Sequence, residues 1–232
     1  MTYRILQLFP ELTDVNGDAQ NALVLTRRLQ WAGHETEQVT LAEGEDAPDF
    51  TPTVVVLGSG VDSALSRTRD ALTHIRSSLE EWISSKVPLL AVGTGMELLG
   101  RSIPLAEPFD GLGILPGEAT RLPKRVTADL VIETPSGQLV GYENHARGFA
   151  LASPAEALGR VLAGTGNGRG TEGVRWESVY GTHLHGPVLA RNPAFADAIL
   201  ASAGIEQTAS STATRVDAIA ARLAQRAIRA AV

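Results

Sequence analysis

The sequence predicts an α/β fold in which helices flank a mixed, mostly parallel sheet. Three apolar segments, residues 3–9, 53–57 and 88–92, are typical of short buried strands. Helical patterns separate them, as expected when crossover connections join parallel strands. Two of the strands end in glycine-rich turns, Gly58–Gly60 and Gly93–Gly95. Buried strands that alternate with helices therefore place the chain in the α/β class.

The helices between these strands are predicted from the spacing of their apolar residues. The turn Asn16–Asp18 is expected to cap the first helix, and Gly33 stands where a C-terminal glycine belongs. One face of that helix carries Ala22, Leu25, Leu29 and Ala32. A second, longer helix has a core stripe formed by Leu72, Ile75, Leu79 and Ile83. Both stripes follow the helical period and are expected to cover the sheet.

The second half of the chain has a different pattern. From about Gly111, β-branched residues and turn signals replace helical periodicity, and we expect an antiparallel extension of the sheet there. Residues 178–184 predict one more strand, and residues 194–201 predict a helix. The main domain is thus expected to span residues 1–205.

The C-terminal part is expected to be a linker and a helix. Residues 206–214, EQTASSTAT, have the composition of a linker. Residues 215–232 form an amphipathic pattern through Val216, Ile219, Leu223 and Ala227. We expect this segment to pack as a helix on the same domain.

Composition narrows the function classes. The 232 residues are 44% hydrophobic and 20% charged, with a net charge of −6. These values predict a globular protein and disfavour nucleic acid as a partner. No apolar run reaches about 18 residues and no signal peptide is evident, so we expect no membrane insertion and a cytoplasmic location. The chain has no cysteine, which excludes disulfides, thiolate metal sites and thiolate catalysis. No metal and no cofactor are expected.

The two glycine-rich turns have two possible meanings. In open α/β sheets, ligands bind at the carboxyl ends of strands, where Gly58–Gly60 and Gly93–Gly95 are expected. Small residues let backbone N–H groups approach a ligand or form an oxyanion hole. Alternatively, the glycines only permit tight strand-to-helix turns. Taken singly, each turn favours the second interpretation.

Three histidines add candidate polar groups. His183 and His185 alternate in GTHLHGP, so on a strand they face the same side. His145 lies in GYENHARG beside Glu143 and Asn144. A ligand-binding role and a supporting hydrogen-bond network both remain open for these groups. A zinc site made by the histidines and Glu143 is a further alternative, although nothing fixes a fourth ligand or a second shell.

Several motifs together resemble one known family. GTHLHGPVLARNP is similar to the GTYLHGPLLxxNP segment of class I glutamine amidotransferases of the cobyric acid synthase type, and GYENHARG resembles their GFENHxGRT segment. NGDAQNALVLTRRLQWAG resembles their N-terminal helix, and GLGILPG and KRVTADLVIET match intervening strands. These motifs extend from about Asn16 to Pro193. They are most similar to GatD-type glutaminase subunits of lipid II isoglutaminyl synthase, which pair with a MurT-type, Mur-ligase-like subunit.

The resemblance implies a three-layer fold and a set of site residues. In the family, a cysteine on a strand-to-helix turn attacks the side-chain amide of glutamine, a histidine activates it, and backbone N–H groups hold the oxyanion. The segment AVGTGMELLG places Gly93 where that cysteine is expected, followed by Thr94 and Gly95. By the same resemblance His185 is the base, and Gly58, Ser59 and Gly60 form the oxyanion-side turn. Arg125 matches an arginine that holds the substrate α-carboxylate.

Glycine has no side chain and cannot act as a nucleophile. The favoured hypothesis is therefore an inactive amidotransferase-like subunit that supports or regulates a Mur-ligase-like or other amidating partner. A second hypothesis is a sensor that binds glutamine through Arg125 and Gly58–Gly60. A third is an active glutamine hydrolase with a displaced nucleophile, for which Thr94 and Ser59 are the candidates.

Overall fold

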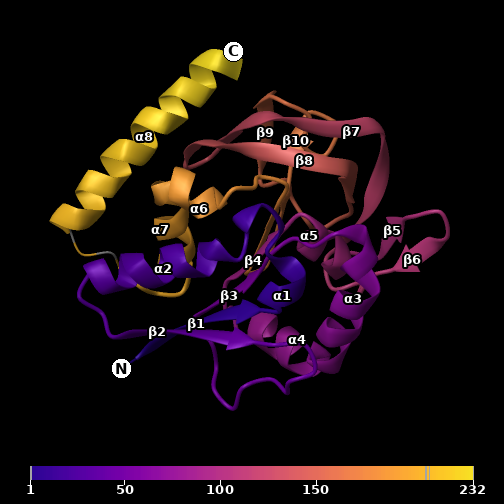
Figure 1. The fold of residues 1–232 in the computed structure, drawn as a ribbon, viewed down its shortest axis with the longest axis horizontal. Coiled ribbons are helices and arrows are strands. Elements are labelled where there is room, and N and C mark those ends of the chain that lie inside the picture. The colour runs from indigo at the N-terminus through magenta and orange to yellow at the C-terminus, as the bar shows by residue number, and fades with distance from the viewer. Residues whose placement is uncertain (1, 207, 209, 232) are drawn as a thin grey trace.

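A six-stranded sheet forms the centre of the protein (Figure 1). The computed structural model describes residues 2–206, 208 and 210–231. The sheet has the order β11-β12-β4-β3-β1-β2, and all neighbours are parallel except β11, which runs antiparallel to β12 at one edge. The predicted mixed, mostly parallel sheet is thus confirmed. Its strands are β1 (Tyr3–Leu8), β2 (Thr36–Leu41), β3 (Val54–Leu57), β4 (Leu89–Val92), β11 (Val174–Trp176) and β12 (Val179–Thr182).

Helices cover both faces of this sheet. Alternating strand residues form two apolar clusters: Leu6, Val55 and Leu89 point into one, whereas Ile5 and Val56 point into the other. The first cluster is completed by α3 (Leu65–His74) and α4 (Arg76–Ser84), and the second by α2 (Gln20–Trp31) and α7 (Pro193–Ser202). The remaining helices are α1 (Pro10–Thr13), η1 (Val15–Gly17), η2 (Asp62–Ala64), α5 (Thr94–Leu99), α6 (Val188–Arg191) and α8 (Ser211–Ala231). Burial of opposite strand faces against separate helix layers produces the three-layer arrangement.

The β-rich second half forms a sheet of its own rather than the expected extension of the central sheet. Four antiparallel strands in the order β10-β9-β7-β8 arch over the carboxyl ends of the central strands (Figure 1). They are β7 (Gly117–Thr134), β8 (Gly137–Leu151), β9 (Gly159–Ala163) and β10 (Thr171–Glu172). A short hairpin, β5 (Ser102–Pro104) and β6 (Pro108–Asp110), lies beside them. β7 pairs with β8 along one edge and with β9 along the other, so its ladder hydrogen bonds are made within this second sheet.

Two predicted elements are shorter than expected. The long helix is broken at Ile75 (φ −100°, ψ 14°), which ends α3 and precedes α4. The strand predicted over 178–184 ends at Thr182, because the chain leaves the sheet before His183. The apolar stripe of the helix and the apolar strand pattern continue across both breaks, so spacing alone does not reveal them.

The C-terminal helix α8 lies along the outside of the β7–β8 hairpin and α6 (Figure 1). It begins at Ser211, four residues inside the segment expected to be linker. Positions 1, 207, 209 and 232 of the expected segments lie outside the described residues. Arg28 of α2 binds Asp217 of α8 and Asp197 of α7, with Nη1 2.7 Å from Asp217 Oδ1 and Nη2 2.7 Å from Asp197 Oδ2. Among the described residues, no helix is long and apolar enough to cross a membrane.

Candidate functional site

The turn after β4 has an unusual backbone conformation. Gly93 lies between β4 and α5 with φ 52° and ψ −120°, and its N–H donates to the Thr182 carbonyl of β12 at 2.8 Å. A residue with a side chain is strained by about 1–3 kcal/mol in such a region. The sharp strand-to-helix turn predicted by the sequence is therefore present, and its apex is a glycine.

Ser59 fills the space that a side chain at position 93 would need. A Cβ atom built on Gly93 would lie 2.5 Å from Ser59 Oγ and 2.9 Å from both Ser59 Cβ and His185 Cε1. Non-bonded carbon atoms attract optimally at about 3.5–4.0 Å, so all three distances are repulsive. Ser59 Oγ also accepts the N–H of Thr94 at 3.2 Å. The serine is thus fixed beside the helix start in place of a side chain at the apex.

The hydroxyl of Thr94 is directed to the neighbouring turn. Thr94 Oγ1 accepts the N–H of Gly60 at 2.7 Å and lies 3.4 Å from Ser59 Oγ. Gly58 and Gly95 do not line the cavity, because they permit close packing behind it: added Cβ atoms would lie 2.0 Å from the Thr13 carbonyl oxygen and 2.4 Å from the Gly58 carbonyl oxygen, respectively. The packing interpretation therefore accounts for these two glycines.

His185 is held by a buried carboxylate. His185 Nδ1 lies 2.7 Å from Asp18 Oδ2, and both side chains are almost fully buried. Burial raises the pKa of Asp18, while its hydrogen bond to His185 opposes that effect. The His185 N–H donates to the Tyr142 carbonyl of β8 at 2.8 Å, so the residue is fixed between the two sheets. Its backbone and one ring nitrogen are therefore both positioned.

The turn Asn16–Asp18 is expected to cap the first helix, but none of its side chains caps α2. The residue before α2 is Ala19, and the carboxylate that accepts its N–H is Asp14, with an N–Oδ1 distance of 3.0 Å. Asp18 instead turns inward to His185. The Asn-Gly-Asp sequence is typical of a turn and gives no sign of this contact with His185. Asp18 does, however, belong to the N-terminal motif that carries the family resemblance.

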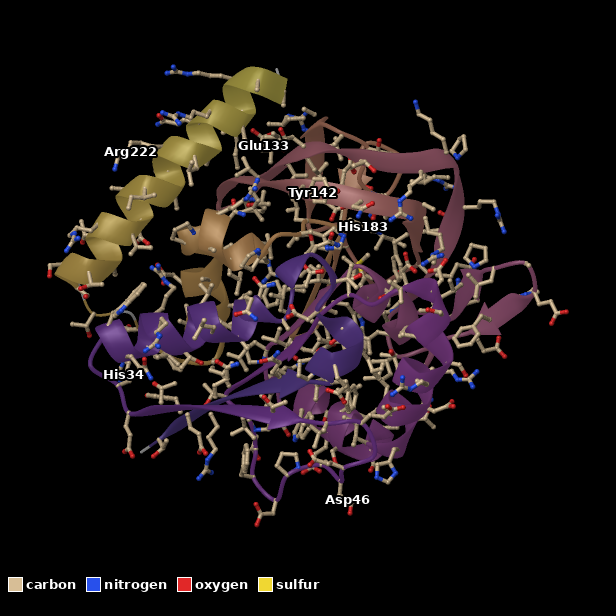
Figure 2. All side chains as sticks on the ribbon, in the orientation of Figure 1. His34, Asp46, Glu133, Tyr142, His183 and Arg222 are labelled. Carbon is tan, nitrogen blue, oxygen red and sulfur yellow. The ribbon has the colours of Figure 1, made fainter. Side chains whose placement is uncertain are left out.

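His183 and His185 do not share a strand face as expected, because both follow the end of β12. His183 is fully buried and its Nδ1 lies 3.1 Å from Glu172 Oε2. Figure 2 shows it in the interior beneath the β7–β8 layer, whereas Arg222 of α8 points away from the body. His183 stacks on His145, with 4.2 Å between ring centroids, and His145 Nε2 lies 3.1 Å from Glu143 Oε2.

A buried arginine that sequence reasoning missed also lies at the site. Arg147 Nε donates to Glu97 Oε2 at 2.7 Å, and its Nη2 donates to Asp62 Oδ1 at 2.7 Å. Glu97 is 2% exposed and Asp62 is 60% exposed at the side chain. The hydrogen bond from Arg147 lowers the pKa of Asp62, although partial burial opposes this effect. Arg147 lies two residues after His145 in the GYENHARG motif, and this position is the sequence feature that could have identified it as a site residue.

Arg125 stands at the exposed edge of the same region. Its Nη2 and Nε donate to Asn144 Oδ1 at 2.7 and 3.0 Å. In the described part of the chain it forms no salt bridge, unlike Arg147. Arg125 therefore remains available to an anionic group.

These residues meet around one cavity of about 240 Å³ at the carboxyl ends of the central strands. It gathers seven of the predicted residues, and Asp62, Glu97, Asn144 and Arg147 also line it. The seven are Ser59, Gly60, Gly93, Thr94, Arg125, His145 and His185. Glu143 and His183 lie behind its wall and do not line it. The residue types can bind a small polar molecule, but no thiol is present.

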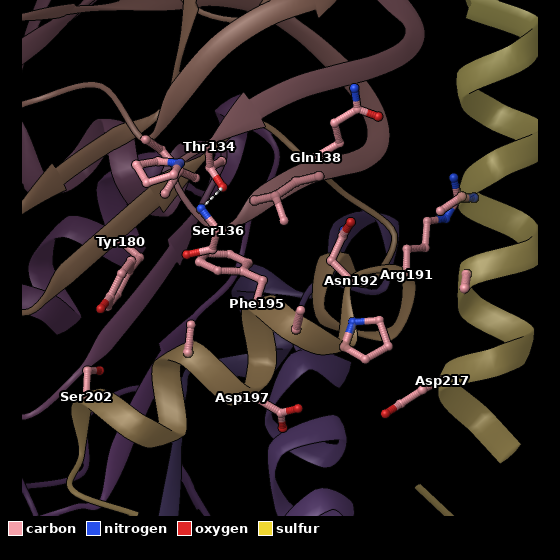
Figure 3. A pocket seen from close by; sticks show the side chains of 18 of the residues that line it. Thr134, Ser136, Gln138, Tyr180, Arg191, Asn192, Phe195, Asp197, Ser202 and Asp217 are labelled. Atoms are coloured by element: carbon pink, nitrogen blue, oxygen red, sulfur yellow. Dashed lines mark hydrogen bonds between the residues drawn. The ribbon is translucent and has the colours of Figure 1, made fainter. Parts of the chain in front are cut away.

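A larger cavity of about 540 Å³ lies elsewhere, between α7, α8 and the β7–β8 turn (Figure 3). Phe195 and Tyr180 contribute to its walls, Asp217 belongs to α8, and Arg191 lies toward that helix. It contains none of the predicted site residues. Among the described residues, no group of three histidine, cysteine or acidic side chains is arranged to hold a metal ion, so the zinc alternative finds no support.

Comparison with known proteins points to one family. Residues 21–193 match the CobB/CobQ-like glutamine amidotransferase domain. The chain is 29% identical over 204 residues to "Lipid II isoglutaminyl synthase (glutamine-hydrolyzing) subunit GatD" of Staphylococcus aureus strain N315, covering 86% of this chain and 83% of that protein. It is also 29% identical to the subunit of the same name from Streptococcus pneumoniae strain ATCC BAA-255 / R6, covering 81% and 75%.

Solved structures support the same fold. A glutamine amidotransferase crystal structure superposes with a TM-score of 0.59 at 19% identity, covering 86% of this chain and 99% of that one. A glutamine amidotransferase from Thermotoga maritima superposes with a TM-score of 0.54 at 16% identity, covering 97% and 93%. At these identities the similarity concerns the fold alone, and the predicted fold class is confirmed.

Proposed function

The chain belongs to the CobB/CobQ-like glutamine amidotransferase family, and from this premise we propose that it is a GatD-like subunit that does not hydrolyse glutamine. The observation that carries the proposal is the glycine at the apex of the turn after β4, together with Ser59 in the adjoining space. The chain has no cysteine elsewhere that can replace the missing thiol. Loss of the attacking group typically lowers the rate by about 10⁴- to 10⁶-fold.

The rest of the site supports a retained binding or scaffolding role. His185 keeps its carboxylate partner Asp18, and Arg147 keeps two carboxylates. The proposed partner is a MurT-type, Mur-ligase-like subunit or another amidating enzyme that takes ammonia from a different source. The relatives support this partner, because they are named as subunits of a lipid II isoglutaminyl synthase.

A glutamine sensor is the second candidate function. Arg125 supports it, because this cation lies at the cavity and has no carboxylate partner among the described residues. A guanidinium binds a carboxylate with two parallel hydrogen bonds, which suits the α-carboxylate of an amino acid. In this form of the proposal, glutamine binds at the cavity and leaves unchanged.

Displaced nucleophiles are a weaker alternative. Thr94 Oγ1 is occupied by the Gly60 N–H, and Ser59 Oγ accepts the Thr94 N–H. Neither hydroxyl has a hydrogen bond to His185, which a serine or threonine nucleophile requires for activation. The variants Thr94→Ala and Ser59→Ala test this alternative directly.

The decisive experiment measures ammonia release from L-glutamine by the purified chain, alone and with a ligase-like partner encoded beside it. We expect no release above the rate of a protein-free control, and no change in Thr94→Ala or Ser59→Ala. Release that disappears in either variant would identify a displaced nucleophile and overturn the proposal. Calorimetry with L-glutamine distinguishes the sensor from a pure scaffold, and Arg125→Ala is expected to abolish binding by the sensor.

A further inference from the structure

Two imidazoles and two carboxylates form a buried chain that runs inward from the cavity wall at His145. The order is Glu143, His145, His183, Glu172, and the four residues are at most 6% exposed. Glu143 and His145 belong to β8, Glu172 ends β10, and His183 follows β12. A chain of ionisable groups in an apolar interior is costly unless its protons and hydrogen bonds are arranged to match.

The hydrogen-bond partners of His145 define its protonation state. Its Nδ1 lies 2.5 Å from the Arg147 carbonyl oxygen, which can only accept. Its Nε2 lies 3.1 Å from Glu143 Oε2. Glu143 accepts the Thr165 N–H at 2.8 Å and the Gly166 N–H at 2.9 Å, and two such donors favour the ionised carboxylate. Both ring nitrogens of His145 must then donate, and the ring is an imidazolium.

The second imidazole has the opposite arrangement. His183 Nδ1 donates to Glu172 Oε2, whereas its Nε2 is buried without a hydrogen-bond partner in the described part of the chain. A proton on Nε2 would have no acceptor among the described residues, so the geometry favours a ring that carries its proton on Nδ1. Its ring stacks on His145 with 21° between the planes. A neutral ring beside a cation is favourable, whereas two stacked cations would repel each other.

The residues beside His145 form the wall of the cavity. Asn144 holds Arg125, and Arg147 binds Glu97 and Asp62. On the other side, Glu143 holds the backbone of Thr165 and Gly166. The imidazolium therefore joins the wall to the loop that follows β9. Loss of one ring proton would remove the His145 hydrogen bond to either the Arg147 carbonyl or Glu143 Oε2, and would set a ring lone pair against that oxygen.

From this geometry we infer that His145 is a positioning residue, held as an imidazolium, whose second proton fixes the cavity wall 144–147. The affinity of the cavity for its ligand then decreases when His145 loses that proton at alkaline pH. The affinity statement rests on the proposed glutamine-binding function, whereas the protonation statement does not. Burial by itself lowers the pKa of His145, but the hydrogen bonds to Glu143 and to the Arg147 carbonyl outweigh it and raise the pKa above its ordinary value.

Nitrogen-15 NMR of histidine-labelled native protein tests the protonation states. Nitrogen chemical shifts distinguish imidazolium from neutral rings, and His145→Gln assigns the signals by removing one ring. We expect both His145 nitrogens to be protonated at pH 7.5, and only one nitrogen of His183. Through-bond assignment on the native chain gives the same answer if the variant does not fold. A neutral His145 at pH 7.5, or a charged His183, would overturn the inference.

Two further measurements separate positioning from simple packing. The amide signals of residues 144–147, 165 and 166 are expected to shift together with the His145 ring as pH rises. Glu143→Gln is expected to lower the pH of that transition by about 1–3 pH units. His74→Gln is the matched control for His145→Gln, because it removes a histidine ring at the surface, where His74 contacts Asp46 at 2.8 Å. This control is expected to leave the transition unchanged. A ring titration without any amide response would refute the positioning role.

Glutamine affinity is then measured in the native chain and in His74→Gln at pH 6.5 and pH 9. We expect weaker binding at pH 9 in both proteins, and weak binding at both pH values in His145→Gln. Equal native affinity at both pH values, with the ring titrated between them, would contradict the inference. If glutamine binds at no pH, the sensor form of the proposed function fails, while the ring and amide signals still decide the role of His145.

Discussion

The turn at Gly93 and the polar residues around the cavity differ in what makes them stable. The turn is most stable without a side chain, whereas the polar residues are stable only when each has its partner. At φ 52° any side chain is strained, so glycine is the most stable residue for the apex. The polar residues depend on one another, since each buried charge needs its partner. We call them the polar frame: Asp18, His185, Glu97, Arg147, Asp62, Glu143, His145, Glu172 and His183.

Under the proposed function, this difference explains how the site can lose its reactive group and keep its shape. Removal of a nucleophile from a strained apex relieves strain and leaves no charge without a partner. Removal of one member of the polar frame leaves a buried charge or hydrogen-bonding group unpaired. Removal of a nucleophile at the apex is therefore expected to cost less stability than removal of a buried partner in the polar frame.

The largest effect on stability is expected inside the polar frame. Glu97→Gln removes the buried carboxylate of the Arg147 cluster, and we expect the free energy of unfolding to fall by about 3 kcal/mol. Urea denaturation measures this loss. Glu81→Gln is the control, because it makes the same chemical change on the exposed side of α4. Equal stability of the two variants would show that the polar frame does not depend on its buried charges.

The apex is expected to respond to an added side chain. Gly93→Cys introduces both backbone strain and the close contact with Ser59, and we expect a loss of about 2–4 kcal/mol. Thermal unfolding measures it. Gly113→Cys is the matched control, because Gly113 also has a positive φ of 67° but has open space around it. Its loss is expected to be about 1–2 kcal/mol.

A second substitution separates the two causes. Ser59→Gly in the Gly93→Cys background removes the atoms nearest to the new Cβ, so part of the lost melting temperature should return. A higher melting temperature for Gly93→Cys than for the native chain would show that Ser59 and the backbone do not oppose a side chain there.

The smallest effect is expected at the exposed end of the Arg147 cluster. Asp62 is 60% exposed at the side chain, so Asp62→Asn is expected to cost below about 1 kcal/mol at neutral pH. Because Arg147 lowers the pKa of Asp62, its contribution is present above the usual value and is lost as pH falls through the lower folded value. Stability measured between pH 5 and pH 2 should decrease less in Asp62→Asn than in the native chain. An identical loss of stability in both proteins between pH 5 and pH 2 would show that Asp62 does not contribute to the Arg147 cluster.

The sequence predicts more of the central sheet than of the site. Apolar runs mark β1, β3 and β4, because burial on both faces leaves a clear pattern, and glycine-rich turns follow β3 and β4. The separate β7–β8 layer is hidden, since antiparallel strands have the same local pattern in either sheet. The sequence shows Gly93 and Ser59. It does not show that Ser59 occupies the space beside Gly93, because this contact joins two separate turns.

The polar frame is only partly visible in sequence for the same reason. Arg147 and Asp18 lie inside motifs, yet their partners are distant along the chain: Asp18 meets His185 167 residues away. Glu172 stands between Thr171 and Gly173, and no local spacing connects it to His183. Pairing of buried charges is a property of the folded chain, so motif reading finds the residues and misses their partners.

The most direct test of a lost nucleophile in an otherwise intact site is ammonia release from L-glutamine by the native chain and by Gly93→Cys/Ser59→Gly, side by side. The double variant places a thiol at the apex and makes room for it beside His185. We predict no release from the native chain and release from the double variant that disappears when His185→Ala is added. Release by the native chain, or none from a folded double variant, would contradict this account.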